Sequence, residues 1–221
     1  MSNILYPALP VHITSWMFSS LKGLSIPGKS TINSGLVGQF IHNHINSNLN
    51  ITTNTIVDLA QLGIEVKTKE YSGNTDWSIG SMTLQDILSK PYIQSSVYLK
   101  LQALLLVKTD DNFRVIKDIA LVYLDCDEVQ ALVEETYEDL RRQLQERVTN
   151  YAINLMNQVK LGNINAILQP ITFKPYEQFK GEYGKFEYMD GTSFQFRINQ
   201  KQMKHLIATA NTAQNSLIQF C

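Results

Sequence analysis

The stretch from Val57 to Thr68 constrains this chain more than any other, because a polar run there gives way to a glycine and then to a strand-like pattern. The five residues after Gly63, numbered 64–68, alternate between apolar and polar. This alternation is typical of a half-buried β-strand, in which side chains two positions apart share a face. We therefore expect Glu65 and Lys67 to project together from one face of a strand.

Asp58 stands shortly before Gly63 and reaches the same place if a hairpin or sharp turn brings the chain back. Two carboxylates beside a lysine can hold a divalent metal ion through oxygen ligands, with the ammonium near an attacking water and a phosphate. Asp58, Glu65 and Lys67 therefore indicate metal-dependent phosphodiester hydrolysis. On spacing alone, a surface strand with a solvated glutamate and lysine remains an alternative.

The spacing of Asp58, Glu65 and Lys67, with a Leu-Gly-Ile run before the glutamate, resembles the catalytic signature of the MutH family. That family contains a mismatch-repair nicking endonuclease and related type II restriction endonucleases, all with the PD-(D/E)xK nuclease fold. Residues 35–41 resemble the family's Gly-Trp-x-Gly-x-Leu-Leu helix, and residues 95–107 resemble its downstream lysine and strand. The resemblance thus extends well beyond the central motif.

The resemblance implies a role for each of these side chains. Asp58 and Glu65 would be metal ligands together with the carbonyl of Val66. Lys67 would be the catalytic lysine, and Lys100 would be a supporting cation. The resemblance also implies Mg²⁺ as the cofactor and double-stranded DNA as the substrate.

His42 departs from the family pattern, because the family's helix carries a glutamate at this place. A neutral imidazole can bind a metal ion or a metal-bound water, but it brings no negative charge. His42 is therefore either a catalytic residue beside the metal cleft or a satisfied histidine at the edge of a helix.

The rest of the pattern predicts an α/β (α+β) protein with a restriction-endonuclease-like fold, in which helices flank a central mixed β-sheet and a hairpin and helix form a C-terminal lobe. Apolar residues at helical spacing predict helices over about 12–22, 35–47, 127–158 and 200–216. Alternating or continuous apolar runs predict strands over about 64–71, 77–83, 104–108 and 113–125, and a hairpin over 185–197. We expect one endonuclease domain over 1–221, with a catalytic core lobe over about 1–125 and a helical and hairpin lobe over about 126–221 that contributes to DNA binding.

Two helices are expected to bury an apolar stripe. In the first, Ser34 is the expected N-cap and a polar loop is expected from Asn46 onward. Its stripe consists of residues at helical spacing: Leu36, Val37, Phe40, Ile41 and Ile45. In the long helix over 127–158, the stripe is expected to run from Val129 to Met156.

A net charge of −1 argues against an indiscriminate polycation, but a site-specific enzyme needs only a local basic cleft. Candidate phosphate contacts are basic residues near the motif and in the C-terminal lobe: Lys29, Lys69, Arg197, Lys201 and Lys204. For Lys29, which lies in a Gly/Pro loop, plain exposure is the alternative. Arg141, Arg142 and Arg147 are interleaved with acids in the long helix, so we interpret them as a solvated ion-pair face.

Cys126 and Cys221 have neither zinc-site spacing nor a disulfide framework, and we expect free thiols in a reducing cytoplasm. The sequence contains neither a leader pattern nor an apolar run of membrane-spanning length, so we expect no membrane partner. We expect a monomer or a homodimer.

Within the family we favour a type II restriction endonuclease over a MutH-type strand-nicking repair enzyme. The stretches outside the core depart from the repair enzyme, and His42 stands in place of its glutamate. A restriction enzyme implies a cognate DNA methyltransferase as a partner in the same system. An alternative of another class is a catalytically inactive DNA-binding module that keeps the fold.

Overall fold

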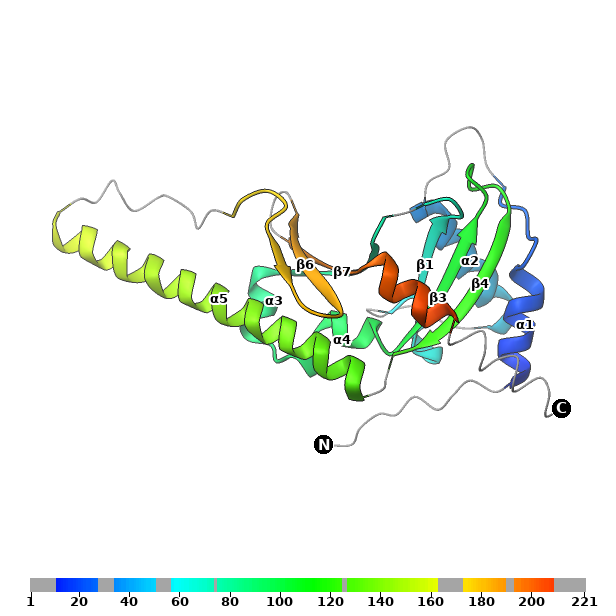
Figure 1. Ribbon diagram of the computed structural model, residues 1–221, viewed down its shortest axis with the longest axis horizontal. Coiled ribbons are helices and arrows are strands. Elements are labelled where there is room, and N and C mark those ends of the chain that lie inside the picture. The colour runs from blue at the N-terminus through cyan, green and yellow to red at the C-terminus, as the bar shows by residue number, and fades with distance from the viewer. Residues whose placement is uncertain are drawn as a thin grey trace.

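A computed structural model of the chain describes residues 11–27, 34–50, 57–73, 75–124, 127–162, 173–189 and 193–208. The described chain forms two β-sheets with helices packed against them (Figure 1). One sheet has three strands of mixed direction, and the other has four antiparallel strands. The expected α+β class and a mixed sheet flanked by helices are confirmed, but the strands divide between this sheet and a second, antiparallel sheet that was not expected.

The three-stranded sheet carries the central motif. Its strands are β1 (Ile64–Glu70), β3 (Ala103–Thr109) and β4 (Ile116–Tyr123), in the order β1-β3-β4. β1 pairs with β3 in parallel, and β3 pairs with β4 as the antiparallel hairpin that the sequence predicted. The alternating residues after Gly63 therefore do form a strand, and that strand lies at the edge of the sheet.

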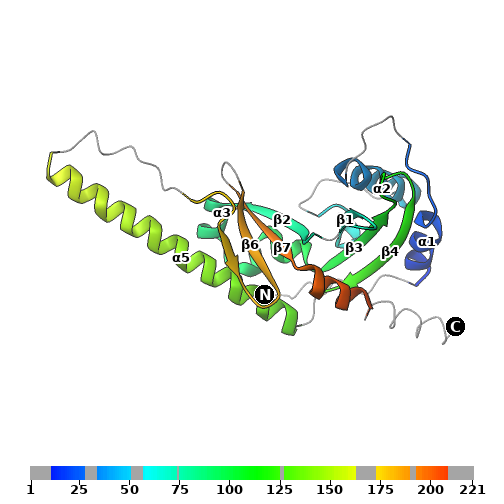
Figure 2. The ribbon, with the colours of Figure 1, turned by 45° about the horizontal axis from the view of Figure 1, so that its top comes forward.

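The two faces of this sheet pack against different cores. One face carries Ile64 and Val66 and packs against α1 (Val11–Leu21) and α2 (Ser34–Leu49), as Figure 2 shows. Residues in between project from the opposite face, because side chains alternate along a strand. Glu65 and Lys67 therefore project away from α1 and α2, toward the side on which the second sheet packs.

The second sheet combines distant parts of the chain. Its strands, in the order β2-β7-β6-β5, are β2 (Trp77–Thr83), β7 (Ser193–Ile198), β6 (Gly184–Met189) and β5 (Gln178–Lys180). The predicted C-terminal hairpin is confirmed by the antiparallel register of β6 and β7. Because β2 pairs with β7, the expected division into lobes at about residue 125 does not separate the two sheets.

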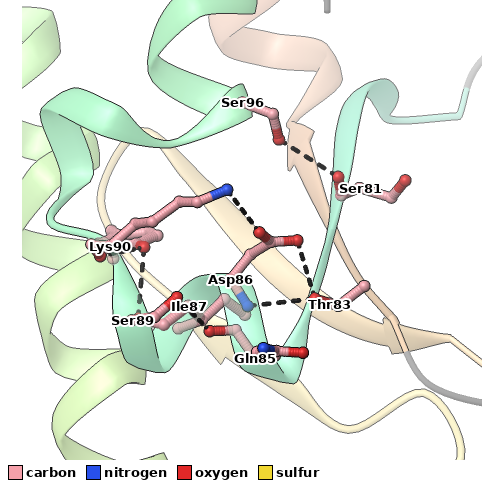
Figure 3. A network of polar contacts seen from close by, with 9 residues as sticks. Ser81, Thr83, Gln85, Asp86, Ile87, Ser89, Lys90 and Ser96 are labelled. Carbon is pink, nitrogen blue, oxygen red and sulfur yellow. Dashed lines mark hydrogen bonds and ion pairs between the residues drawn. The ribbon is translucent and has the colours of Figure 1, made fainter.

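Short helical elements connect β2 to β3. They are α3 (Leu84–Ser89), the 3-10 helix η2 (Tyr92–Gln94) and α4 (Ser96–Lys100). Thr83 caps α3 by accepting a hydrogen bond from the backbone N–H of Asp86 at 3.1 Å, and Lys90 pairs with the carboxylate of Asp86 at 2.6 Å (Figure 3). These contacts fix the start of the segment that ends at Lys100.

The long helix α5 (Asp127–Lys160) packs against the second sheet along its N-terminal part, as far as about Arg147. Leu140 and Leu144 are fully buried, whereas Met156 is 60 % exposed. Figure 1 shows α5 extending well past the four-stranded sheet. The apolar stripe expected as far as Met156 is therefore buried only to Leu144. Arg147 also differs from the predicted helix-face ion pairs, because it pairs with Glu177 ahead of β5.

Three details of α2 differ from the sequence prediction. Leu36 was expected on the buried stripe but is 51 % exposed. Ser34 is the first residue of the helix rather than its N-cap, and the helix continues to Leu49 into the stretch expected to be a loop. The polar side chains at 46–48 are compatible with this, since they lie on a helix that has only one face to bury.

Several predicted features lie outside the described residues: Lys29, both cysteines, the hairpin turn at 190–192 and the last helix beyond residue 208. Within the described part, residues 200–208 are helical, and the N–H of Gln202 donates to the side chain of Asn199 at 2.9 Å. None of the helices in the described ranges has the length and apolar character needed to cross a membrane.

Candidate active site

A tight turn brings the chain back on itself just before β1. The 3-10 helix η1 (Ala60–Leu62) ends at Gly63, whose backbone is left-handed with φ 66° and ψ 25°. Glycine adopts this conformation without the steric penalty that a Cβ atom would bring. On either side of the turn, the N–H of Leu59 donates to the carbonyl of Ile64 at 2.8 Å, and the reverse bond is 3.3 Å long. The residue before Leu59 is thereby placed opposite the residue after Ile64.

Asp58 and Glu65 meet across this turn. The backbone N–H of Asp58 donates to Oε2 of Glu65 at 3.3 Å, and the backbone N–H of Val66 donates to Oδ2 of Asp58 at 3.0 Å. Each carboxylate is therefore oriented by the backbone of the opposite segment. The structure thus brings together Asp58 and Glu65, the two carboxylates that were expected to be metal ligands, beside the backbone of Val66.

Glu65 is the buried centre of a charged cluster. Its Oε1 lies 2.8 Å from Nζ of Lys67 and 2.7 Å from Nζ of Lys100. The Glu65 side chain is only 1 % exposed, whereas each lysine side chain is 20 % exposed. A buried carboxylate is stable only when charges and hydrogen bonds compensate for its lost hydration. The two ammonium groups supply that compensation and leave their own outer sides open to the solvent.

The cluster lines a cleft of about 840 Å³. One wall comes from α2 and includes His42, another comes from β1, and a third comes from the segment that leads into β2. The Nε2 atom of His42 is buried and has no hydrogen-bond partner among the described residues. His42 thus lines the cleft from α2, and its role stays a prediction.

The charges along the cleft are mixed. Its charged lining consists of three lysines and four carboxylates: Lys67, Lys69, Lys100, Asp58, Glu65, Glu70 and Asp76. The cleft is therefore not basic by itself, which differs from the expected basic groove. A bound divalent cation would reverse the balance and allow the cleft to accept a phosphate group.

The donor set limits which metal the cleft can hold. In the described part of the chain, no group of three or more His, Cys, Asp or Glu side chains converges as a metal site. Asp58 and Glu65 are the carboxylates that meet in this part of the cleft, so a metal ion held there would take most of its ligands from water. This suits Mg²⁺, which keeps several waters and is commonly held by one or two carboxylates.

No family model matches this chain, and neither does any curated protein. We therefore infer the function from the geometry of the cleft, the chemistry of its side chains and the MutH-like pattern of the sequence.

Lys69 lies in the cleft but is engaged with other groups. Its Nζ donates to the carbonyl of Thr75 and to Oε1 of Gln200, the latter at 3.3 Å, and lies 5.2 Å from the centre of the Trp77 ring. Burial lowers the pKa of the Lys69 ammonium below its usual range. Gln200 belongs to the helix after β7, so Lys69 links the motif strand to the C-terminal part of the chain. No local pattern in the sequence signals this contact.

The other predicted phosphate contacts occupy different environments. Lys201 and Lys204 are exposed on the helix at residues 200–208. Arg197 lies on β7 with its Nε 2.9 Å from Oε2 of Glu187 on the neighbouring strand, as an ion pair without hydrogen-bond alignment. Lys201 and Lys204 are thus open to solvent, whereas 26 % of the Arg197 side chain is exposed.

Proposed function

We propose that this chain is a Mg²⁺-dependent endonuclease that hydrolyses phosphodiester bonds in double-stranded DNA, and that it is a type II restriction endonuclease. The observation that supports this most strongly is the convergence of Asp58, Glu65, Lys67 and Lys100 in one cleft. These are the residues that the MutH-like signature implies, and they come from three separate segments of the chain. A surface strand with solvated side chains would not bury Glu65 to 1 % exposure.

The residues present fit a magnesium site. Asp58 accepts a hydrogen bond through Oδ2 from the backbone N–H of Val66, which orients its carboxylate in the cleft. Asp58, Glu65 and the carbonyl of Val66 would hold the ion, in keeping with its preference for oxygen ligands. When bound, Mg²⁺ would supply a Lewis acid that neutralises charge on the phosphate and makes water a better nucleophile.

Lys100 and Lys67 would have different roles. Lys100 holds Glu65 in place from α4, and Lys67 reaches the same oxygen from the strand itself. With Glu65 satisfied by the metal and by Lys100, the Lys67 ammonium is free to donate to a phosphate oxygen or to orient the attacking water. Charge placed in advance where negative charge develops is an effective form of catalysis. His42 lines the same cleft from α2, but its Nε2 is covered, so it would have to turn before it could bind that water.

The DNA would bind along the open side of the cleft. Lys201 and Lys204 follow Gln200 on the same helix, and Gln200 contacts Lys69 in the cleft. Phosphates entering the cleft would therefore meet these two exposed lysines beside it. Arg197 is committed to Glu187 and would stabilise the β6–β7 pair rather than hold a phosphate.

Incubation of supercoiled plasmid and phage DNA with the protein and Mg²⁺ tests the proposal. Linear product, mapped by end sequencing to one short site, supports a restriction endonuclease. Nicked circles support a strand-nicking enzyme instead, and tight binding without any Mg²⁺-dependent product supports a DNA-binding module. Either of those two results overturns the proposed function. A restriction enzyme also requires a cognate DNA methyltransferase in the same cell, and DNA modified by that enzyme should resist cleavage.

Lys67→Ala connects the activity to this site. We expect it to abolish cleavage while leaving DNA binding largely intact, because the lost ammonium acts on the reacting phosphate. Lys117→Ala is the matched control, since Lys117 is an exposed lysine on β4 that does not line the cleft. A fully active Lys67→Ala enzyme would refute the assignment of the site.

A further inference from the structure

Lys100 reaches Glu65 by crossing a position that has no side chain. A Cβ atom placed on Gly80 would lie 2.9 Å from Cδ of Lys100 and 3.7 Å from its Cε. Carbon atoms without a bond between them do not approach to 2.9 Å, since attraction is greatest at about 3.5–4.0 Å. The stem of Lys100 therefore occupies the space that any residue larger than glycine would need.

We infer that Gly80 is a positioning residue: the space left by its missing side chain, called here the seat, holds the stem of Lys100 so that its ammonium contacts Glu65. Because Lys100 then pairs with Glu65, Lys67 is free to contact the phosphate. The catalytic meaning of Gly80 rests on the proposed function, but the seat itself is a property of the fold. Gly80 leaves room for the stem of Lys100 and does not line the cleft in which substrate and metal would bind.

The fold around Gly80 is built to hold this arrangement. The register between β2 and β7 shifts between Ser78 and Gly80, so β2 carries a bulge at this point. Glycine within a strand commonly marks such a bulge or a close approach by another group. Next to it, the hydroxyl of Ser96 donates to the carbonyl of Ser81 at 3.3 Å and fastens the start of α4 to β2 (Figure 3). Lys100 is the last residue of this helix.

The two lysines reach Glu65 by different routes, which gives them different freedom to move. Lys67 is two residues from Glu65 on the same strand, so its ammonium can swing away without disturbing another element. Lys100 comes from α4, and its path is confined at Gly80. Without Lys100, Lys67 would have to remain on Glu65 as its only ammonium. Gly80 thus determines which lysine stays with the carboxylate and which one can act.

A double-mutant cycle with Gly80→Ala and Lys100→Ala tests the inference. Lys100→Ala should lower the single-turnover cleavage rate about 10- to 100-fold, as expected for loss of a charge-assisted contact. Gly80→Ala should lower it by a smaller factor, because it displaces the lysine stem without removing the ammonium. The double variant should cleave no more slowly than Lys100→Ala alone, because the added methyl then has no stem to displace. Ser81→Ala is the control, since its side chain is exposed and only its carbonyl contacts Ser96. Additive losses in the double variant would overturn the inference.

Urea unfolding of the same four proteins tests the contact between position 80 and Lys100 without reference to the proposed activity. Gly80→Ala should lower the unfolding midpoint in the wild-type background, and should not lower it in the Lys100→Ala background. This result would support the seat even if the chain cleaves no DNA. If Gly80→Ala alone does not fold, the double variant must fold, and its failure to do so would overturn the inference.

Discussion

Asp58 and Glu65 hold each other in place across Gly63, because the N–H of Asp58 donates to Glu65 while the N–H of Val66, the neighbour of Glu65, donates to Asp58. The two acids are therefore fixed before any cation binds. A site organised in this way binds an ion with less loss of side-chain freedom than a flexible one. Asp58 therefore contributes both a hydrogen-bond acceptor for the fold and a negative charge for the ion. Suitable substitutions can remove the charge with or without the acceptor.

Asp58→Asn and Asp58→Ala should affect different properties. The amide oxygen of asparagine can still accept the hydrogen bond from Val66, so this variant should unfold in urea much as the wild type does. Alanine removes that acceptor and should cost about 0.5–1.5 kcal/mol of stability. Both variants lose a negative charge, so calorimetric titration with Mg²⁺ or Mn²⁺ should give much weaker binding for both. Unchanged metal affinity in Asp58→Asn would contradict the role of Asp58 as a ligand.

Glu65→Gln should destabilise the protein even without metal or DNA. The change leaves the ammonium groups of Lys67 and Lys100 beside a neutral amide, where they repel each other and lose a charge-assisted partner. We expect a loss of about 1.5–3 kcal/mol in the free energy of unfolding.

Added salt should recover part of this loss, because both lysines are partly exposed and their repulsion is screened. The further change Lys67→Met in the Glu65→Gln background should also recover stability, since it removes the repulsion. If this double variant is less stable than Glu65→Gln alone, the repulsion is not the cause.

The site could be predicted from the sequence to the extent that local chemistry builds it. Glycine at position 63 and the alternation after it are enough to predict a turn and a strand, and this places Glu65 and Lys67 on one face. The turn also accounts for Asp58, because a short reversal cannot carry it far from the start of the strand. The β3–β4 hairpin and α5 follow from equally local patterns, which the structure confirms.

The rest depends on contacts between distant segments. β2 pairs with β7, although most of the chain's second half lies between them. Nothing near Trp77 in the sequence distinguishes this partner from β1. The contact between Lys69 and Gln200 and the seat of Lys100 on Gly80 both follow from how the two sheets meet. Periodicity also overestimates burial, as Leu36 and Met156 illustrate, because an apolar stripe does not specify how far a partner extends along it.

The uneven burial of α5 predicts two very different effects of truncation to alanine. Leu144→Ala removes a fully buried side chain from the core against the second sheet, and should cost about 2–5 kcal/mol of stability. Met156 lies on the same helix, but its side chain is 60 % exposed. Met156→Ala should therefore change the free energy of unfolding by no more than about 0.5 kcal/mol. Urea unfolding of the two variants measures both effects. A similar loss in each would mean that the second half of α5 is as well packed as the first.

The pair of Arg147 and Glu177 should make stability depend on pH in acid. Arg147 lies on α5 and Glu177 lies just before β5, so their ion pair fastens the long helix to the edge of the second sheet. The hydrogen bond from Arg147 lowers the pKa of Glu177 below its usual range. The folded state therefore binds this proton less readily than the unfolded state. The resulting stability is fully present above the unfolded pKa of about 4.3 and is lost as the pH falls through the lower, folded pKa.

Glu177→Gln removes this contribution. The difference in unfolding free energy between the wild type and the variant should be greatest at neutral pH, at about 1 kcal/mol for a partly exposed pair. It should shrink below about pH 4 as Glu177 in the folded wild type takes up a proton. Glu146→Gln is the matched control, because Glu146 pairs with Arg142 on the exposed surface of the same helix and should give a much smaller difference at every pH. A difference for Glu177→Gln that stays constant from pH 7 to pH 3 would show that the charge of Glu177 does not hold α5 to the sheet.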